Sequence, residues 1–263
     1  MQKTQLGSTD LFVSRLGLGA MKFGRNTKVK YPWHYELPNE NTIKELLAVA
    51  KDVGINLLDT APAYGDCENR LGKLLKGQRQ NWILSTKVGE SFHDGISDYC
   101  FTTECIKESV ENSLKRLRTD YLDIVFIHSN GNDETIIKSG ALGILAELKR
   151  AGKLRYFGMS TKTKEGGLRA LDQSDVAMVA YNPDYVDEEP VLDFANDKKK
   201  GILVKKALGS GHYCLSGKTS ESLHFALNHP GVSSVLIGTI NQKHLKEDAT
   251  IVEEFYSIKE KVT

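Results

Sequence analysis

The sequence predicts an α/β fold, namely an eight-stranded parallel β/α (TIM) barrel with an N-terminal β-hairpin as a cap. Short apolar segments typical of buried strands alternate with amphipathic segments typical of helices, and each kind occurs eight times. The chain of 263 residues matches the usual size of one such barrel, so we expect a single domain over residues 1–263. A turn-rich segment at 7–10 separates two alternating segments within 2–14, which predicts the hairpin.

The predicted strands recur at intervals that leave room for one helix between neighbours. We expect strands at 16–19, 55–58, 82–86, 121–127, 155–159, 176–180, 201–204 and 233–237. We expect helices at 40–53, 67–76, 103–117, 134–151, 164–172, 187–199, 218–228 and 241–260. This order implies parallel strands joined by right-handed crossovers. An open, doubly wound sheet is the alternative, but a G-x-G-x-x-G nucleotide motif does not follow the first strand, where residues 17–19 are only a fragment of one.

Two of the predicted helices carry signals at their ends. The segment TTE at 102–104 precedes an apolar stripe, which is typical of a capped helix start. The segment 134–151 is followed by Gly152, a residue typical of helix C-termini. Both helices are therefore predicted to belong to the scaffold of the barrel.

The charge and hydropathy of the chain argue against several kinds of partner. The 35 basic and 34 acidic residues nearly cancel, so nothing in the charge indicates a nucleic acid or an anionic membrane. The sequence has no apolar run of 18 residues and no leader-like core at its start. We therefore expect a cytoplasmic protein without a membrane span.

The four cysteines are Cys67, Cys100, Cys105 and Cys214, and they show neither C-x-x-C spacing nor histidines at zinc-site distances. We expect free thiols and no metal site. Cys67, three residues after Tyr64, is either a small filler residue or a neighbour of a ligand.

Four ionisable side chains follow three successive predicted strands, at the end where a barrel enzyme places its chemistry. Asp59 ends the second strand and Tyr64 lies in the loop after it, Lys87 follows the third strand, and His128 follows the fourth. Each has an ordinary explanation by itself, such as a helix cap for Asp59 or a satisfied buried histidine at 128. Lys87 also suits a Schiff base, as in barrel aldolases. Their joint placement favours a catalytic site.

The four side chains suit the addition of hydride to a carbonyl group. A lysine ammonium stabilises a tyrosinate by roughly 4 kcal/mol at ~4 Å and an effective dielectric constant of ~20, so we expect Lys87 to lower the pKa of Tyr64. Asp59 is expected to hold Lys87 in an ion pair. His128 is expected to donate a hydrogen bond to the carbonyl oxygen that Tyr64 protonates. These side chains carry no hydride, so a nicotinamide cofactor is required.

Two glycine loops late in the chain predict where the cofactor phosphates bind. The seventh strand is followed by Gly209, Ser210 and Gly211, and the eighth by Gly238, Thr239 and Asn241 ahead of the last helix. Barrels commonly bind phosphate with these two loops, because small residues let backbone N–H groups approach an anion. Either loop alone is also compatible with a plain turn.

The segment 22–39 is long for a connection in a barrel and follows the first strand on the catalytic face. Its Trp33, His34 and Tyr35 either form a wall of a substrate pocket or belong to an ordered surface loop without a ligand role. The sequence leaves both open.

Several motifs, taken together, resemble the aldo-keto reductase family over nearly the whole chain. Residues 16–24 (LGLGAMKFG) resemble the family's opening LGLGxMxFG, and residues 59–68 (DTAPAYGDCE) resemble its DTAxxYGxxE signature. Residues 152–160 (GKLRYFGMS) resemble GKIRYIGVS, and the block 113–128 matches another stretch that ends in His128.

The resemblance implies roles for individual residues. It implies a catalytic tetrad of Asp59, Tyr64, Lys87 and His128, with Tyr64 as the acid. It implies contacts to the nicotinamide from Ser160, Met178 and Lys205. It implies further contacts to the cofactor from Gly19, Ala20, Met21, Thr161 and Tyr181. It implies that the adenosine end is held by Gly238, Thr239, Asn241, His244, Glu247 and Asp248.

The chain also departs from the family pattern. Thr161 and Met178 replace an asparagine and a glutamine, and Lys205 or Lys206 stands where an aromatic residue usually stacks on the nicotinamide. Ile240 stands where an arginine usually binds the 2′-phosphate, and Lys243 and His244 are the candidates to replace it. We therefore expect NADPH as cofactor, with NADH possible.

The resemblance implies NADPH-dependent reduction of small-molecule aldehydes or activated ketones. The alternative is a cofactor-bound regulatory or sensor protein of the same fold in which turnover is vestigial, because the expected contacts to the nicotinamide are altered. The sequence does not identify the natural substrate.

Overall fold

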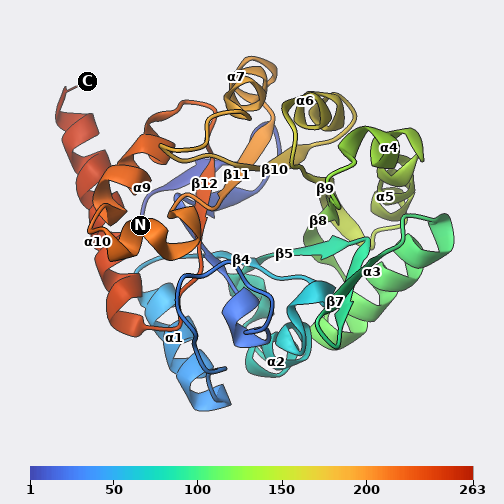
Figure 1. Cartoon of the computed structure of the whole chain (residues 1–263), viewed down its shortest axis with the longest axis horizontal. Helices are drawn as coiled ribbons and strands as arrows, with labels where there is room; N and C mark the ends of the chain where they lie inside the picture. The colour runs from blue at the N-terminus through green and yellow to red at the C-terminus, as the bar shows by residue number, and fades with distance from the viewer. Residues whose placement is uncertain (263) are drawn as a thin grey trace.

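Eight parallel strands close into a barrel in the computed structural model, which describes residues 1–262 (Figure 1). Their bounds are β3 (Leu16–Gly19), β4 (Leu57–Asp59), β5 (Ile83–Val88), β8 (Leu122–His128), β9 (Leu154–Ser160), β10 (Val176–Ala180), β11 (Gly201–Lys205) and β12 (Ser234–Ile237). Each strand pairs with the next one around the ring, and β12 pairs with β3 to close it. This confirms the predicted fold class.

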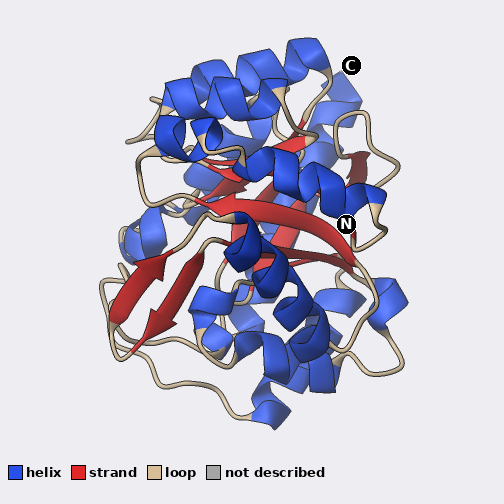
Figure 2. Ribbon diagram, turned by 90° about the vertical axis from the view of Figure 1, so that its right-hand side faces the viewer, coloured by secondary structure: helices blue, strands red, loops and turns tan. Residues whose placement is uncertain are grey.

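Helices surround the strands, as the side view shows (Figure 2). The α-helices are α1 (Glu40–Asp52), α2 (Cys67–Leu74), α3 (Thr103–Leu117), α4 (Asp133–Lys138), α5 (Ala141–Arg150), α6 (Lys164–Asp172), α7 (Glu189–Lys198), α8 (His212–Leu215), α9 (Thr219–Asn228) and α10 (Gln242–Val262). Short 3-10 helices are η1 (Met21–Phe23), η2 (Pro62–Tyr64), η3 (Arg79–Asn81) and η4 (Gly209–Gly211). The first and last long helices, α1 and α10, lie side by side (Figure 1).

The predicted cap of the third long helix is present, because the Thr102 side chain accepts a hydrogen bond from the backbone N–H of Cys105. The predicted helix at 134–151 is wrong in one respect, since it is two helices, α4 and α5. The break falls at Gly140, whose φ of 84° belongs to the left-handed region that glycine adopts readily.

The N-terminal hairpin closes the end of the barrel opposite the strands' carboxyl termini. Strands β1 (Lys3–Gln5) and β2 (Phe12–Ser14) pair antiparallel. Leu6, Leu11 and Val13 of this hairpin belong to the same buried cluster as Leu57 and Ile124 from inside the barrel. The predicted cap is therefore confirmed, and apolar burial is what holds it in place.

A second hairpin, which the sequence analysis did not predict, follows β5. Strands β6 (Glu90–His93) and β7 (Ile96–Tyr99) pair antiparallel around Asp94 and Gly95, both with positive φ. Asp-Gly between two short extended segments is a common hairpin signal. This hairpin packs against η2, the 3-10 helix that ends with Tyr64.

The expectation of four free thiols is wrong for two of the cysteines. Cys100 and Cys105 form a disulfide across the turn that leads from β7 into α3, where the chain reverses and brings their Cα atoms to 6.0 Å. Cys67 and Cys214 are free. Cys67 is buried, and its Sγ donates to the backbone oxygen of Ala20 at 3.1 Å, so it serves as a filler residue.

The disulfide leads to a prediction about stability. Replacing both cysteines, as C100S/C105S, is expected to lower the free energy of unfolding by about 2 kcal/mol, because the bridge restricts a short loop of the unfolded chain. Urea denaturation with and without reductant measures the loss, and the reductant should affect the parent chain but not the double variant. Cys214→Ser is the matched control. An unchanged midpoint in the double variant contradicts the prediction.

Candidate active site

Lys87 and Asp59 form a buried ion pair at the carboxyl ends of neighbouring strands. The Lys87 Nζ lies 2.6 Å from Oδ2 of Asp59 and donates a second hydrogen bond to the backbone oxygen of Thr60 at 3.0 Å. The other carboxylate oxygen of Asp59 accepts from the Ser85 hydroxyl at 2.5 Å. Only 2% of the Lys87 side chain and 5% of the Asp59 side chain are exposed. The two charges are therefore fixed in position and shielded from water.

Tyr64 is positioned by a close contact between two backbone segments. A Cβ atom on Gly24 would lie 2.2 Å from the backbone oxygen of Tyr64, and one on Gly65 would lie 2.2 Å from the backbone oxygen of Gly24. Side chains at these two positions would therefore push the loops apart. The glycines of the two motifs, which are 41 positions apart, thus serve one purpose, the placement of the tyrosine.

The Tyr64 ring lies close to both the ammonium of Lys87 and the imidazole of His128. The Lys87 Nζ is 4.8 Å from the centroid of the ring, and the His128 ring is perpendicular to it with 6.4 Å between centroids. Burial raises the pKa of Tyr64, and this outweighs the lowering effect of Lys87. The expected net lowering of this pKa is therefore wrong, because desolvation of the phenolate is the larger effect. Tyr64 stays protonated at neutral pH.

His128 ends β8 and has a carboxylate neighbour that the sequence analysis missed. Its Nδ1 lies 2.7 Å from Oε2 of Glu90, the first residue of the β6–β7 hairpin, although the ring is turned so that the contact is not a well-aligned hydrogen bond. Burial lowers the pKa of His128, Glu90 raises it, and Lys87 and Lys205 lower it further. The net direction is downward.

Lys205, at the end of β11, is hydrogen-bonded to two residues that are expected to contact the cofactor. Its Nζ donates to the Ser160 hydroxyl at 2.8 Å and to the backbone oxygen of Thr161 at 2.7 Å. The Thr161 hydroxyl in turn donates to Glu188 at 2.7 Å. Burial lowers the pKa of Lys205 to about 7, while Glu188 acts in the opposite direction. The mouth of the barrel therefore holds two lysines, Lys87, which is buried, and Lys205, which is partly buried.

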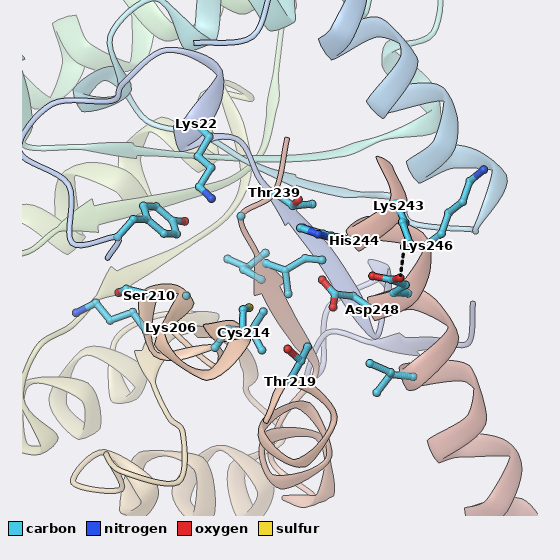
Figure 3. A pocket seen from close by; sticks show the side chains of 18 of the residues that line it. Lys22, Lys206, Ser210, Cys214, Thr219, Thr239, Lys243, His244, Lys246 and Asp248 are labelled. Atoms are coloured by element: carbon cyan, nitrogen blue, oxygen red, sulfur yellow. Dashed lines mark ion pairs between the residues drawn. The ribbon is translucent and has the colours of Figure 1, made fainter. Parts of the chain in front are cut away.

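A cleft of about 880 Å³ lies beside this group, and Figure 3 shows its lining. It runs between the loops after β11 and β12 and the start of α10. Among the residues expected to bind the cofactor, those lining it are Ser210, Gly211, Gly238, Thr239, His244, Glu247 and Asp248. The size falls within the range of small-molecule sites.

The chemistry of this cleft suits an anionic, elongated ligand. Lys22, Lys206, Lys243 and Lys246 contribute to its lining, and Lys22 points toward its interior (Figure 3). At the start of α10, the N–H groups of Lys243 and His244 donate to Oδ1 of Asn241. Glu247 and Asp248 are the acidic residues of the lining. Burial and Glu247 raise the pKa of Asp248 to about 7, which reduces its negative charge. The lining therefore fits a dinucleotide, with its phosphates near the lysines.

The long segment between η1 and α1 crosses the cleft. A Cβ atom on Gly211 would lie 2.8 Å from the Trp33 ring, and one on Gly238 would lie 2.5 Å from the hydroxyl of Tyr31. The Lys22 Nζ lies 3.8 Å from the centroid of the Tyr31 ring, and burial lowers its pKa to about 8. The segment is thus a strap over the cleft rather than a plain surface loop.

The expected residues of this segment and of β10 are not all at the cleft. Trp33 lines it, whereas His34 is exposed and pairs with Glu36. Tyr35 is buried, and its hydroxyl donates to the backbone oxygen of Arg25. Tyr181 lies apart from the group, because its ring stacks on Phe225 of α9 with 4.9 Å between centroids. Its contact with the cofactor stays a prediction.

The remaining expected residues lie around the catalytic group or in supporting positions. Gly19 is the register partner of Asp59, Ala20 donates to the Asp59 backbone oxygen at 2.8 Å, and Met21 begins η1. Met178 is beside Ser160 in the sheet but belongs to the apolar cluster inside the barrel. Gly209 and Asn241 make contacts within their own parts of the chain. Gly209 lies against Tyr213, and Oδ1 of Asn241 accepts a hydrogen bond from the Lys243 N–H at 2.9 Å.

The sequence analysis missed several residues of the site, among them Tyr31, Glu90 and Glu188. Glu188 precedes α7, and Glu90 is the first residue of the β6–β7 hairpin. The only sequence signal for this hairpin was its Asp-Gly turn. Within residues 1–262, no cluster of His, Cys, Asp or Glu suits a metal ion, and none of the helices combines the length and apolar composition needed to cross a membrane.

Comparison with known proteins adds independent information. The model of the Aldo/keto reductase family matches residues 15–224. Aldo-keto reductase YhdN of Bacillus subtilis is 34% identical over 232 residues, which cover 86% of this chain and 67% of that protein. NADH-specific methylglyoxal reductase of Escherichia coli is 34% identical over 222 residues, which cover 78% of this chain and 66% of that protein. A solved aldo-keto reductase structure from Pseudomonas aeruginosa is 45% identical, covers 97% of this chain and 95% of that one, and has a TM-score of 0.89.

The buried ion pair leads to a test by a double-mutant cycle. Asp59→Leu is expected to lower the free energy of unfolding by about 3–5 kcal/mol, because it leaves the buried Lys87 ammonium without its partner. The double variant D59L/K87M should lose less than the single variant, since no buried charge remains. Urea denaturation measures all three chains. Additive losses from Asp59→Leu and Lys87→Met would contradict a tight pair.

Proposed function

This chain belongs to the aldo/keto reductase family, and from this premise we propose that it reduces aldehydes or activated ketones with NADPH, using Tyr64 as the general acid. As a member of the family, it is an NAD(P)H-dependent oxidoreductase that acts on carbonyl groups of small molecules. The observation that carries the finer proposal is the buried Lys87–Asp59 pair beside Tyr64, next to a cleft lined by lysines.

The proposed mechanism gives each side chain one task. Residues at the mouth of the barrel, Ser160 and Thr161 among them, would hold a nicotinamide, which would supply the hydride for the carbonyl carbon. Tyr64 donates its proton to the carbonyl oxygen, for which its raised pKa keeps it in the required form at neutral pH. Lys87, held by Asp59, stabilises the phenolate that develops as this proton leaves. His128 positions the carbonyl oxygen by a hydrogen bond.

NADPH as the preferred cofactor is supported by the charges at the far end of the cleft. Lys243 and His244 lie in the first turn of α10, where the His244 ring points toward Thr239 (Figure 3). Lys243 also pairs with Glu247 at 3.7 Å, which reduces its availability to a 2′-phosphate. The relative from E. coli is NADH-specific by name, so NADH stays the second candidate.

A cofactor-bound sensor with vestigial turnover is the alternative function. It is favoured by one observation, namely that the ammonium of Lys205 is hydrogen-bonded to both Ser160 and Thr161, where a nicotinamide amide is expected to bind. The intact arrangement around Tyr64 favours turnover. The two functions differ in whether NADPH is consumed.

Tyr64→Phe tests the assignment of the acid. We expect turnover to fall by about 10²–10⁴-fold, the usual contribution of a general acid, while cofactor binding is unchanged because the ring is retained. NADPH absorbance at 340 nm with an activated aromatic aldehyde measures turnover, and fluorescence titration measures binding. Normal turnover in the variant would refute the role of Tyr64. Binding without oxidation by the parent chain would favour the sensor.

The cofactor preference is tested with K243A/H244A. If these residues bind the 2′-phosphate, the preference for NADPH over NADH in kcat/KM should fall on the order of tenfold, the effect of losing about 1.4 kcal/mol. Lys261→Ala, in the last turn of the same helix, is the charge control. Equal losses with both cofactors would place the recognition of the 2′-phosphate elsewhere.

A further inference from the structure

The contact between Glu90 and His128 is a feature that the proposed mechanism does not use. Oε2 of Glu90 lies 2.7 Å from Nδ1 of His128, and the two side chains are 8% and 19% exposed. They come from different elements, since Glu90 begins the β6–β7 hairpin and His128 ends β8. The contact therefore depends on how the hairpin packs over the mouth of the barrel.

We propose that Glu90 is a positioning residue that keeps a proton on Nδ1 of His128, so that Nε2 can donate a hydrogen bond to the substrate only from the imidazolium form. This inference rests on the proposed function, because it concerns the histidine that orients the carbonyl oxygen. It assigns to a hairpin residue the control over which protonation state of His128 is active.

The argument starts from the two atoms in contact. A carboxylate oxygen and an imidazole nitrogen at 2.7 Å would repel each other if both presented lone pairs, so a proton lies on Nδ1. In the neutral ring the second nitrogen, Nε2, then has no proton and can only accept a hydrogen bond. A carbonyl oxygen is also an acceptor, so the neutral ring cannot bind it. The imidazolium ring, which has protons on both nitrogens, can.

The carboxylate of Glu90 is itself fixed and ionised. Its Oε1 accepts a hydrogen bond from the Ser97 hydroxyl on β7 at 2.7 Å. Burial raises its pKa, but the contacts with His128 and Ser97 and the charge of Arg25 lower it to about 2. Tyr99, also on β7, has its own pKa raised by burial and by Glu90. Glu90 is therefore ionised at neutral pH.

The charged and titratable groups that face His128 from other elements oppose this carboxylate. Burial of the ring has the largest effect and disfavours the imidazolium, and Lys87 from β5 and Lys205 from β11 disfavour it further. Tyr64 from η2 stays neutral. Among the groups that act on His128, Glu90 alone favours the imidazolium. Without it, the protonated form would require a lower pH. Reduction should therefore become faster as the pH falls through the titration of His128.

The balance of protons is simple. Tyr64 gives its proton to the carbonyl oxygen, the hydride adds to the carbonyl carbon, and the two protons of the imidazolium remain on His128 throughout. The histidine contributes a hydrogen bond and a positive charge, and Glu90 favours this form of the ring against burial and the two lysines. No additional reactant is needed.

The first experiment reads the ring directly and needs no variant. Long-range ¹H–¹⁵N NMR of the full chain distinguishes a protonated from an unprotonated ring nitrogen, and the spectrum of His128→Gln assigns the signals of His128. We expect Nδ1 to carry the proton in the neutral ring. A neutral ring that carries its proton on Nε2 would overturn the proposal.

The second experiment uses two variants with the same change of charge on one hairpin. Glu90→Gln removes the carboxylate that touches His128, and Asp98→Asn removes an exposed one on β7. The NMR titration midpoint of His128 is expected to fall in Glu90→Gln and to stay in place in Asp98→Asn. Equal shifts, or no shift in Glu90→Gln, would overturn the proposal. If Glu90→Gln does not fold, Ser97→Ala, which frees Oε1, should shift the midpoint in the same direction by less.

Kinetics separates this inference from the proposed function. At neutral pH, Glu90→Gln should lower kcat for aldehyde reduction on the order of tenfold with the KM for NADPH unchanged, and its rate should recover at lower pH. A merely structural loss would be independent of pH and would overturn the inference. If the parent chain oxidises no NADPH, the proposed function fails, and the NMR midpoints still decide the role of Glu90.

Discussion

The ion pair between Lys87 and Asp59 is the constraint on which the rest of the site depends. Both charges are almost fully buried, and such a pair is tolerated only when every remaining hydrogen-bonding group is satisfied. Ser85 and the backbone of Thr60 meet this requirement, and they come from β5 and from the end of β4, the same parts of the barrel as the pair. The closed barrel is therefore what allows an ammonium ion to be held next to the Tyr64 ring without water.

The positive charge at the mouth of the barrel has a second consequence. Lys87 is buried and Lys205 is partly buried there, and Lys22 and Lys206 line the adjoining cleft. This concentration of positive charge suits an anionic ligand, and it contributes to the lowered pKa of His128 and of Lys205. Carboxylates at selected points offset it, with Asp59 against Lys87, Glu188 against Lys205, and Glu90 against His128. We interpret the acidic residues as the groups that decide which nitrogen atoms carry protons.

The strap, the segment between η1 and α1, contributes Tyr31 and Trp33 to the lining of the cleft. A partly desolvated lysine is stabilised there too. Lys22 is enclosed by the rings of Tyr31, Trp33 and Tyr35, so its charge is stabilised by aromatic faces instead of a carboxylate. The burial of Lys22 and its reduced pKa leave the ammonium weakly paired and close to the cleft. An anionic ligand would be a stronger partner than the rings.

The sequence by itself determined the barrel, its N-terminal hairpin, and the strand ends that carry Asp59, Lys87 and His128. These features follow from periodicity and from apolar runs, which are local properties of the chain. Tertiary structure alone decided the partners. Glu90 meets His128 and Gly24 meets Gly65 only because segments far apart in the chain fold together. It also decided the pKa of Tyr64, since a sequence names the nearby lysine but not the depth of burial, and here burial has the larger effect.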